Sequence, residues 1–178
     1  MNFSDVFPKM IENIKETLLK VDDKTIDLSV DILKDSSTIF VYGAGRSGIV
    51  ARSFAMRLVQ LGLKTYIIGE SVTPIVKEND AVVIVSNKGE SFSSVQVGNI
   101  VRRVGAKLIV FTSNPNSKLA HISSVKVTVP SVVQDKNMPL GTLFEASCYI
   151  LFDAIISILM NKLNESEESM RARHAIMV

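Results

Sequence analysis

Short, nearly uninterrupted apolar runs alternate in this chain with longer segments whose apolar residues recur every three or four positions. The runs are rich in Val and Ile, and the run at residues 81–86 is apolar except for its last residue. Such runs are typical of parallel strands covered on both faces of a sheet. They predict five strands, at residues 38–42, 64–68, 81–86, 108–112 and 125–130.

Helical spacing fills the intervals and both ends of the chain. Ser4 is the expected cap of the first helix, and Gly62 and Gly105 stand where the helices ahead of them should end. The alternation of strands and helices over short connections predicts an α/β fold, a three-layer α-β-α sandwich around a five-stranded parallel sheet of Rossmann-like or flavodoxin-like topology. The predicted helices cover residues 4–20, 23–34, 46–61, 92–104, 115–122, 141–163 and 165–173.

The length of 178 residues allows one domain with a core of its own, and neither an internal repeat nor a linker divides the chain. We expect a single domain over residues 1–178. It would consist of a two-helix segment at residues 1–35, a core at 36–130 and C-terminal helices at 139–174.

The composition is that of an ordinary globular protein, with 47% hydrophobic and 21% charged residues and a net charge of +2. A nucleic-acid or membrane-surface binder would carry a basic stripe, so neither partner is expected. Cys148 is the only cysteine, which excludes an internal disulfide and argues against a cysteine-based metal site. Because we find no signal-peptide pattern and no apolar run of membrane-spanning length, we expect a cytoplasmic protein.

The first strand ends in a glycine-rich turn, Gly-Ala-Gly-Arg-Ser-Gly at residues 43–48, and helical spacing begins directly after it. Glycines let a ligand approach the backbone, and the free N–H groups of a first helical turn attract an anion. Arg46 adds a charged fork and Ser47 a hydroxyl at the same place. This junction predicts half of a phosphate-binding site.

The same glycines fit the dinucleotide pattern G-x-G-x-x-G, with Glu70 about 20 residues further on. Three features favour a small sugar phosphate or organic phosphate instead. The turn presents the polar Arg46 and Ser47, the chain leaves little length for a substrate domain, and a second polar turn follows the third strand. The residues alone leave open whether the turn binds a small phosphate, a dinucleotide or neither.

The second polar turn is Ser-Asn-Lys-Gly-Glu-Ser at residues 86–91, between the third strand and a helix. Ser86 and Ser91 offer hydroxyls to an anion. Lys88 offers a point charge and Gly89 a bare backbone. The plainer interpretation is a solvated turn in which Ser91 caps the helix. Since parallel strands end at one edge of a sheet, we expect the two turns to lie at the same edge.

Three further segments make the pattern more specific: Phe-Ala-Met-Arg-Leu at 54–58, Gly-Glu-Ser-Val-Thr-Pro at 69–74 and Met-Pro-Leu-Gly-Thr-Leu-Phe-Glu at 138–145. With the two turns, they resemble the sugar isomerase (SIS) domain family, and within it the 6-phospho-3-hexuloisomerases, from about residue 37 to residue 174. The resemblance implies a cofactor-free enzyme of the ribulose monophosphate route that converts 3-hexulose 6-phosphate into fructose 6-phosphate, and a homotetramer. The substrate-binding or phosphate-binding residues that it implies are Gly45, Arg46, Ser47, Ser86, Asn87, Lys88, Gly89 and Ser91.

Two stretches depart from the family pattern. The family has Ser-Gly-Ser-Gly-Glu-Thr at the second turn, so Lys88 replaces a phosphate-binding serine and Ser91 a threonine. The chain ends His-Ala-Ile-Met-Val from His174, where the family has His-Ala-Asn-Leu-Glu. We expect Lys88 to take over part of the phosphate contact; a Lys88 side chain that points to solvent is the other interpretation.

Moving a carbonyl between adjacent carbons needs a base that carries a proton from one carbon to the next. Glu145 is the candidate base, at the start of a long helix among apolar neighbours; the plainer interpretation is a glutamate that favours the helix dipole. His174 is the candidate acid or proton shuttle. Four residues from the chain end, it would complete a neighbouring subunit's site, or else it is simply an exposed histidine.

The remaining residues with possible chemistry have weaker signals. His121 and Cys148 are expected to be structural. Arg57 is open between a surface ion pair and a substrate contact, and Glu70 between the pocket mouth and a solvated loop. The alternative function is a sugar-phosphate-binding module without turnover, and the retained Glu145 favours an enzyme. The apolar surface of the first two helices and of residues 141–163 favours a homo-oligomer.

Overall fold

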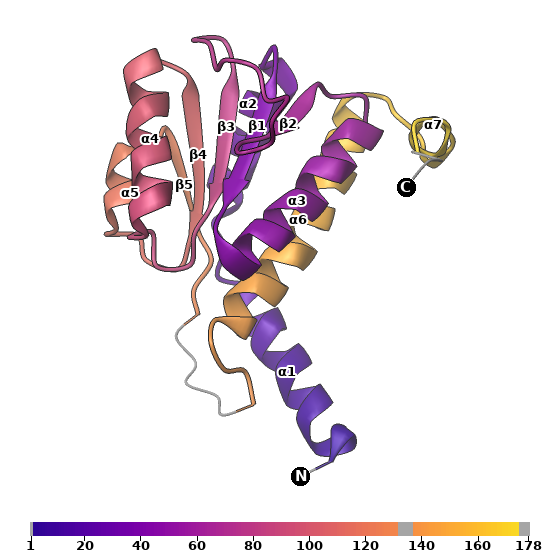
Figure 1. Cartoon of the computed structure of the whole chain (residues 1–178). Helices are drawn as coiled ribbons and strands as arrows, with labels where there is room; N and C mark the ends of the chain where they lie inside the picture. Colours follow the sequence, from indigo (N-terminus) through magenta and orange to yellow (C-terminus); the bar gives the residue numbers. More distant parts are fainter. Residues whose placement is uncertain (1, 132–136, 175–178) are drawn as a thin grey trace.

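The computed structural model of the chain describes residues 2–131 and 137–174 (Figure 1). Its centre is a parallel sheet with the strand order β2-β1-β3-β4-β5. The predicted α/β sandwich around five parallel strands is therefore confirmed. The strands are β1 (Ile39–Gly43), β2 (Thr65–Ile67), β3 (Ala81–Val85), β4 (Lys107–Thr112) and β5 (Val125–Thr128).

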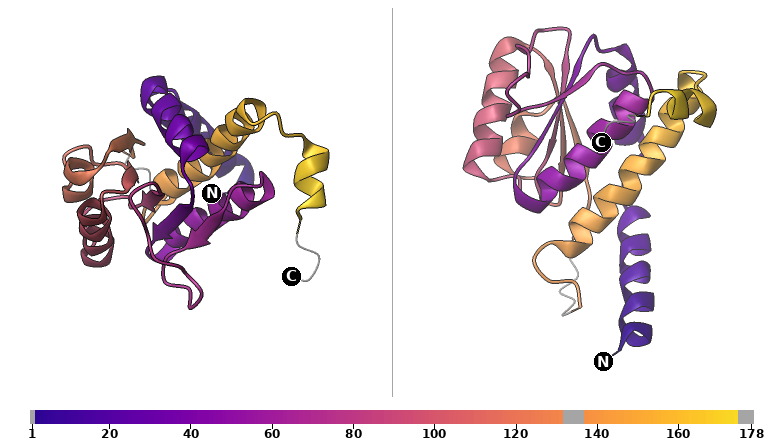
Figure 2. Two further views of the ribbon diagram at one scale, coloured as in Figure 1. Left: turned by 90° about the horizontal axis from the view of Figure 1, so that it is seen from above. Right: turned by 45° about the vertical axis from the view of Figure 1, so that its right-hand side comes forward.

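Helices cover both faces of the sheet. On one face lie α4 (Phe92–Val104) and α5 (Lys118–Ile122), and on the other α2 (Asp23–Asp35), α3 (Gly45–Gln60) and α6 (Thr142–Lys162) (Figure 1, Figure 2). Because strand side chains alternate, Val83 and Ile109 belong to the core under α3 and α6, while Ile84 and Val110 belong to the core under α4. All residues of β3 are buried, as its apolar run predicts.

α6 is a 21-residue helix that runs along the face covered by α3 (Figure 1). Its length and composition would allow it to cross a membrane, which corrects the expectation that no apolar stretch reaches that length. However, 56% of its most apolar window is buried inside the protein. There the ring of Phe152 stacks on Phe54 with 4.4 Å between centroids and meets Phe111 edge-on at 4.8 Å. These contacts account for the apolar character of α6 as that of a core helix.

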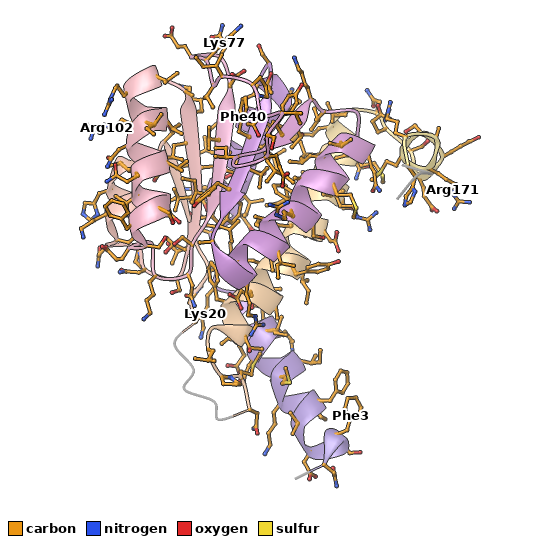
Figure 3. The ribbon with its side chains drawn as sticks, in the orientation of Figure 1. Phe3, Lys20, Phe40, Lys77, Arg102 and Arg171 are labelled. Atoms are coloured by element: carbon orange, nitrogen blue, oxygen red, sulfur yellow. The ribbon has the colours of Figure 1, made fainter. Side chains whose placement is uncertain are left out.

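The two outermost helices project from this body. α1 (Phe3–Leu18) packs the C-terminal half of its apolar stripe, including Ile14, against Leu143 of α6, while its first turns extend away with Phe3 at the free end (Figure 3). α7 (Glu167–Ala172) lies beyond the opposite end of α6, where Figure 3 labels Arg171. α1 and α7 thus lie at opposite ends of α6.

Three predicted helix starts are wrong, and one of them is that of α7, which begins at residue 167 and not at 165 because the Ser166 hydroxyl accepts the N–H of Ser169 at 3.1 Å. α1 is capped by Asn2 and not by Ser4, because the Asn2 side chain accepts the N–H of Asp5 at 3.1 Å and the Asp5 carboxylate accepts the N–H of Asn2 at 3.0 Å. α5 begins at residue 118 and not at 115, because the Ser117 hydroxyl caps it by accepting the N–H of Ala120 at 3.2 Å.

Candidate active site

β1 and β3 are neighbours in the sheet, but the helices that follow them, α3 and α4, cover opposite faces (Figure 1). Where two such helices part, a crevice opens at the carboxyl ends of the strands, and open α/β sheets bind their ligands there. The register pairs Gly43 with Val85, so the two polar turns start side by side. The expectation that both turns lie at one edge is confirmed.

The first polar turn depends on the contact between Gly43 and Gly48. A Cβ on either residue would overlap the backbone of the other, so the strand and helix approach more closely than a side chain would allow. Gly45 opens α3 with a φ of +57°, in the left-handed region that favours glycine. No described side chain caps α3, so the N–H groups of its first turn remain available to an anion.

The second polar turn packs against Ser117 at Gly89. Gly89 has a φ of +66°, and a Cβ there would overlap the Ser117 hydroxyl, so both the backbone conformation and the space require glycine. Ser91 occupies the N-cap position of α4, but its hydroxyl donates to Ser94 Oγ at 2.6 Å. Ser91 is therefore the N-cap residue that the plainer interpretation expects, although its hydroxyl does not bond the helix backbone.

A cavity of about 360 Å³ lies between the two turns. It brings together four residues predicted to bind phosphate, three with hydroxyls and one with an ammonium group. The cavity is at the small end of the range for ligand sites, which suits a compact phosphorylated molecule. Its lining consists of Ala44, Ser47, Val85, Ser86, Lys88, Glu90 and Ser91.

Glu90 is a lining residue that the sequence reasoning did not select. Its Oε1 accepts the backbone N–H of Lys118 at 2.8 Å, and its Oε2 lies 3.0 Å from Lys118 Nζ. The backbone N–H of Lys118, and then its ammonium group, lower the pKa of Glu90. The carboxylate is thereby paired with α5. Glu90 could have been selected from the sequence because it lies within the second polar turn, between Gly89 and Ser91.

Glu145 reaches the first polar turn from the start of α6. The residue is 7% exposed, and its Oε1 accepts the Ser47 hydroxyl at 3.3 Å. Its Oε2 lies 3.0 Å from Arg46 Nε in an ion pair, yet accepts no aligned hydrogen bond from the described residues. Arg46 Nη1 also donates to Thr142 Oγ1, at 3.4 Å. Ser47 therefore links the carboxylate to the cavity, and the enclosed Oε2 faces Arg46.

The other predicted binding residues surround the cavity without lining it. Gly45 and Arg46 are exposed in the first turn, and Gly89 packs against Ser117. Asn87 faces away from the cavity, because its Oδ1 accepts the Ser113 hydroxyl at 2.7 Å. These positions shape the two turns more than they contact a ligand in the cavity.

His174 lies far from Glu145 within one chain. Glu145 is in the first turn of α6, whereas His174 lines a groove of about 560 Å³ with Met160 and Met170, near the other end of that helix. At 1.5 Å per residue, the two side chains are separated by about 20 Å along α6. Residues 175–178 lie outside the described residues, and they include the three positions at which the sequence departs from the family ending.

Cys148 and His121 are placed as the sequence predicts. Cys148 is fully buried, and this desolvation, with Glu145 as a second cause, raises the pKa of its thiol well above the ordinary value. His121 lies on α5, where its Nδ1 is 2.8 Å from the carbonyl oxygen of Ser117. Neither residue lines the cavity between the turns.

The two residues left open by the sequence are both in ion pairs. Arg57 Nε lies 3.6 Å from Asp153 Oδ1 on the exposed side of α3 and α6, which favours the surface-pair interpretation. Glu70 pairs with Arg52 of α3. In the ranges 2–131 and 137–174, no group of three or more His, Cys, Asp or Glu side chains is arranged to hold a metal ion.

Comparison with known proteins agrees with this geometry. Residues 32–156 match the SIS domain family. A 3-hexulose-6-phosphate isomerase from Methylomonas aminofaciens is 35% identical, over 96% of this chain and 94% of its own, and an uncharacterized protein from Archaeoglobus fulgidus is 33% identical over 99% of both. The crystal structure of a hypothetical protein from Methanococcus jannaschii, which was used to infer a molecular function of 3-hexulose-6-phosphate isomerase, has a TM-score of 0.87 at 28% identity and covers 98% of both chains.

Proposed function

This chain belongs to the SIS domain family, and from that premise we propose that it is a phosphosugar isomerase that converts 3-hexulose 6-phosphate into fructose 6-phosphate. Full-length relatives that carry the name 3-hexulose-6-phosphate isomerase support this substrate, among them one from Bacillus subtilis with 30% identity over 98% of both chains. We assign the reaction to the ribulose monophosphate route on the same basis.

The observation that carries the proposal is the position of Ser47 between the cavity and Glu145. Ser47 lines the cavity, and its hydroxyl donates to Glu145 Oε1 at 3.3 Å. A buried carboxylate therefore lies next to two turns that are suited to a phosphate group. An isomerase that holds a phosphorylated sugar at one end and transfers a proton at the other needs this combination.

We assign to Glu145 the transfer of a proton from C2 to C3, in two steps. In 3-hexulose 6-phosphate the carbonyl is at C3, and in fructose 6-phosphate it is at C2. Glu145 takes the proton from C2, the electrons of the C–H bond form the C2–C3 double bond, and the negative charge moves to O3. Glu145 then returns the proton to C3, while the hydroxyl proton of O2 leaves and O3 is protonated. The substrate and product are at the same oxidation level, so we expect no cofactor.

We assign the proton exchange between O2 and O3 to His174 of a second copy of the chain. Within one chain His174 lies about 20 Å from Glu145 along α6, too far for both to contact one sugar. A homotetramer, as the family resemblance implies, would supply the histidine from a neighbour.

One observation favours the alternative of a sugar-phosphate-binding module without turnover. Glu145 Oε2 is enclosed and faces Arg46 Nε at 3.0 Å, so the carboxylate contacts a cation where a base must contact a carbon-bound hydrogen. In the isomerase, Arg46 moves aside when a substrate occupies the site. In a binding module, the ion pair persists with the ligand bound.

A coupled assay separates these functions. Formaldehyde and ribulose 5-phosphate, with added hexulose phosphate synthase, supply 3-hexulose 6-phosphate, and the appearance of fructose 6-phosphate is followed. We expect turnover by the wild-type chain and a decrease in kcat of about a thousandfold for Glu145→Gln, the range typical of a lost general base. Stabilisation by fructose 6-phosphate in a thermal-shift assay, without any turnover, would instead identify a binding module.

A further inference from the structure

The start of α6 has no cap of its own among the described residues. Gly141 holds the N-cap position with a φ of +84°, and no side chain there bonds the first N–H groups of the helix. The carbonyl oxygen of Gly141 accepts the N–H of Glu145 at 3.1 Å. Whatever fixes Gly141 therefore also fixes the backbone of the proposed base.

Asn87 contacts this helix start from the second polar turn. A Cβ on Gly141 would lie 2.9 Å from Asn87 Nδ2 and 3.8 Å from Glu145 Oε1. The carboxamide of Asn87 thus packs on the Gly141 backbone, on the side where the Glu145 carboxylate lies. Gly141 is needed here both for its positive φ and because a side chain would displace Asn87.

Asn87 is itself held by the ends of two other strands. Its Oδ1 accepts the hydroxyls of Ser113 at 2.7 Å and Ser131 at 3.4 Å. Its backbone carbonyl oxygen accepts the N–H of Ser113 and the hydroxyl of Thr112, both at 2.9 Å. Ser113 follows β4 and Ser131 follows β5, so one side chain connects the carboxyl ends of three neighbouring strands to α6.

We propose that Asn87 is a positioning residue for the reaction: its carboxamide, held by Ser113 and Ser131, fixes Gly141 and through it the Glu145 carboxylate. This inference rests on the proposed function. A displacement of a reacting group by about 1 Å can cost a hundredfold in rate. Asn87 does not line the cavity, so its loss acts on the proton transfer and leaves the phosphate contacts in place.

Asn87→Ala tests the proposal in the coupled assay. We expect kcat to fall by about 10- to 100-fold, with KM changed by less than about threefold, because binding and positioning are separated. Ser113→Ala should lower kcat in the same direction, and the double variant should lose less than the product of the two single losses, since both act through one contact. Asn99→Ala, on the exposed face of α4, is the matched control and should keep wild-type rates.

Hydrogen exchange gives a readout that does not depend on activity. The amide of Glu145 should exchange about tenfold faster in Asn87→Ala, while that of Ile155, deep in α6, keeps its protection. An unchanged kcat in Asn87→Ala, beside an active wild type, would overturn the inference. An unchanged Glu145 exchange rate would overturn it even if the wild type proves to lack isomerase activity, so this failure is distinct from failure of the proposed function. If Asn87→Ala does not fold, Ser113→Ala serves for both measurements.

Discussion

Lys88 is one of the residues at which the second polar turn departs from the family pattern, and it lies in the cavity lining with Ser47, Ser86 and Ser91. A hydroxyl needs a defined direction to bind an oxygen, whereas an ammonium group acts as a flexible point charge. Its attraction to a phosphate dianion reaches further and is screened more strongly by salt. A lysine in place of a serine should therefore make phosphate binding more dependent on the salt concentration.

Lys88→Ser should preserve the binding of fructose 6-phosphate and make its Kd less dependent on salt, and Lys88→Glu should abolish binding. Titrations over a series of salt concentrations measure this. Lys107→Ser, at the first residue of β4 and so at the opposite edge of the sheet, should follow the wild type. Superimposable curves for wild type and Lys88→Ser would mean that Lys88 only points to solvent.

The two polar turns could be predicted from the sequence because their glycines and hydroxyls are contiguous and their strands are apolar. The pairing of Arg46 with Glu145 could not, since it joins the start of α3 to the start of α6. Asn87 was predicted to bind the substrate because it lies in the second polar turn, and its contacts with other elements were equally hidden in the sequence. Its actual partners, Ser113 and Gly141, become neighbours only when the strand ends converge.

At the scale of elements, α6 is held on the sheet through Phe152, whose ring contacts Phe54 of α3 and Phe111 of β4. Phe152→Ala should lower the free energy of unfolding by about 3–5 kcal/mol, because it removes a buried ring and leaves a cavity between three elements. Urea denaturation measures the change. Asn161→Ala, on the exposed side of the same helix, should cost less than about 1 kcal/mol. Equal losses would show that Phe152 is not the main anchor.

α7 is short and its attachment should depend on pH. Arg173 donates to Glu165 at 2.8 and 2.9 Å and to the carbonyl oxygen of Gln60 at 3.2 Å. The bond from Arg173, and then that from Ser169, lower the pKa of Glu165. A carboxylate with a lowered pKa stabilises the docked state above its ordinary pKa of about 4.3, and this contribution is lost as the pH falls through the lowered value.

We therefore expect the amides of α7 to exchange faster below about pH 4, once the intrinsic rates are corrected for pH. Glu165→Gln should exchange at the faster rate at every pH, because it cannot be deprotonated. Arg173 stays charged throughout and adds no titration of its own. A wild-type profile as flat as that of Glu165→Gln would contradict this account of the attachment.

The strands and long helices were the predictable elements, because periodicity is a local property. β3 matches its apolar run, and α6 begins and ends within one residue of its predicted bounds. The exact helix ends were harder to predict, because several residues within two or three positions could cap the same helix. At α1, Asn2 is the cap and Ser4 is not. The membrane-length character of α6 was missed because two acidic residues, Glu145 and Asp153, interrupt the run in the sequence.

For the whole molecule, the apolar residues left exposed support the expectation of a homo-oligomer. Phe3, Phe7 and Ile11 lie one turn apart along the projecting part of α1, and the rings of Phe3 and Phe7 stack with 5.3 Å between centroids. Tyr149 and Ile150 are half exposed on α6. Apolar patches of this kind usually mark contacts between proteins. A stable monomer in sedimentation at micromolar concentration would count against the oligomer.

A mixed oligomer tests whether His174 acts in a neighbour. Glu145→Gln and His174→Ala should each be nearly inactive alone. Co-expressed in equal amounts, they should regain about one quarter of the wild-type activity, because a random assembly pairs intact Glu145 with the intact His174 of a neighbour at that frequency. Each homo-oligomer, mixed after assembly, is the control. No recovery on co-expression would mean that both residues act within one subunit or that His174 has no role.

The helices on the two faces of the sheet are completed at different times during translation. α4, α5 and the strands beneath them come from one continuous stretch of chain, whereas the opposite face is closed by α6, the last of the covering helices to leave the ribosome. Until then Val83 and Ile109 have an incomplete cover, so stalled nascent chains that end before Thr142 should be cleaved readily by protease and chains that extend well past Lys162 should resist it. A message truncated ahead of α6 would then yield both polar turns without Glu145, and cellular proteases would degrade the product as an unfolded chain.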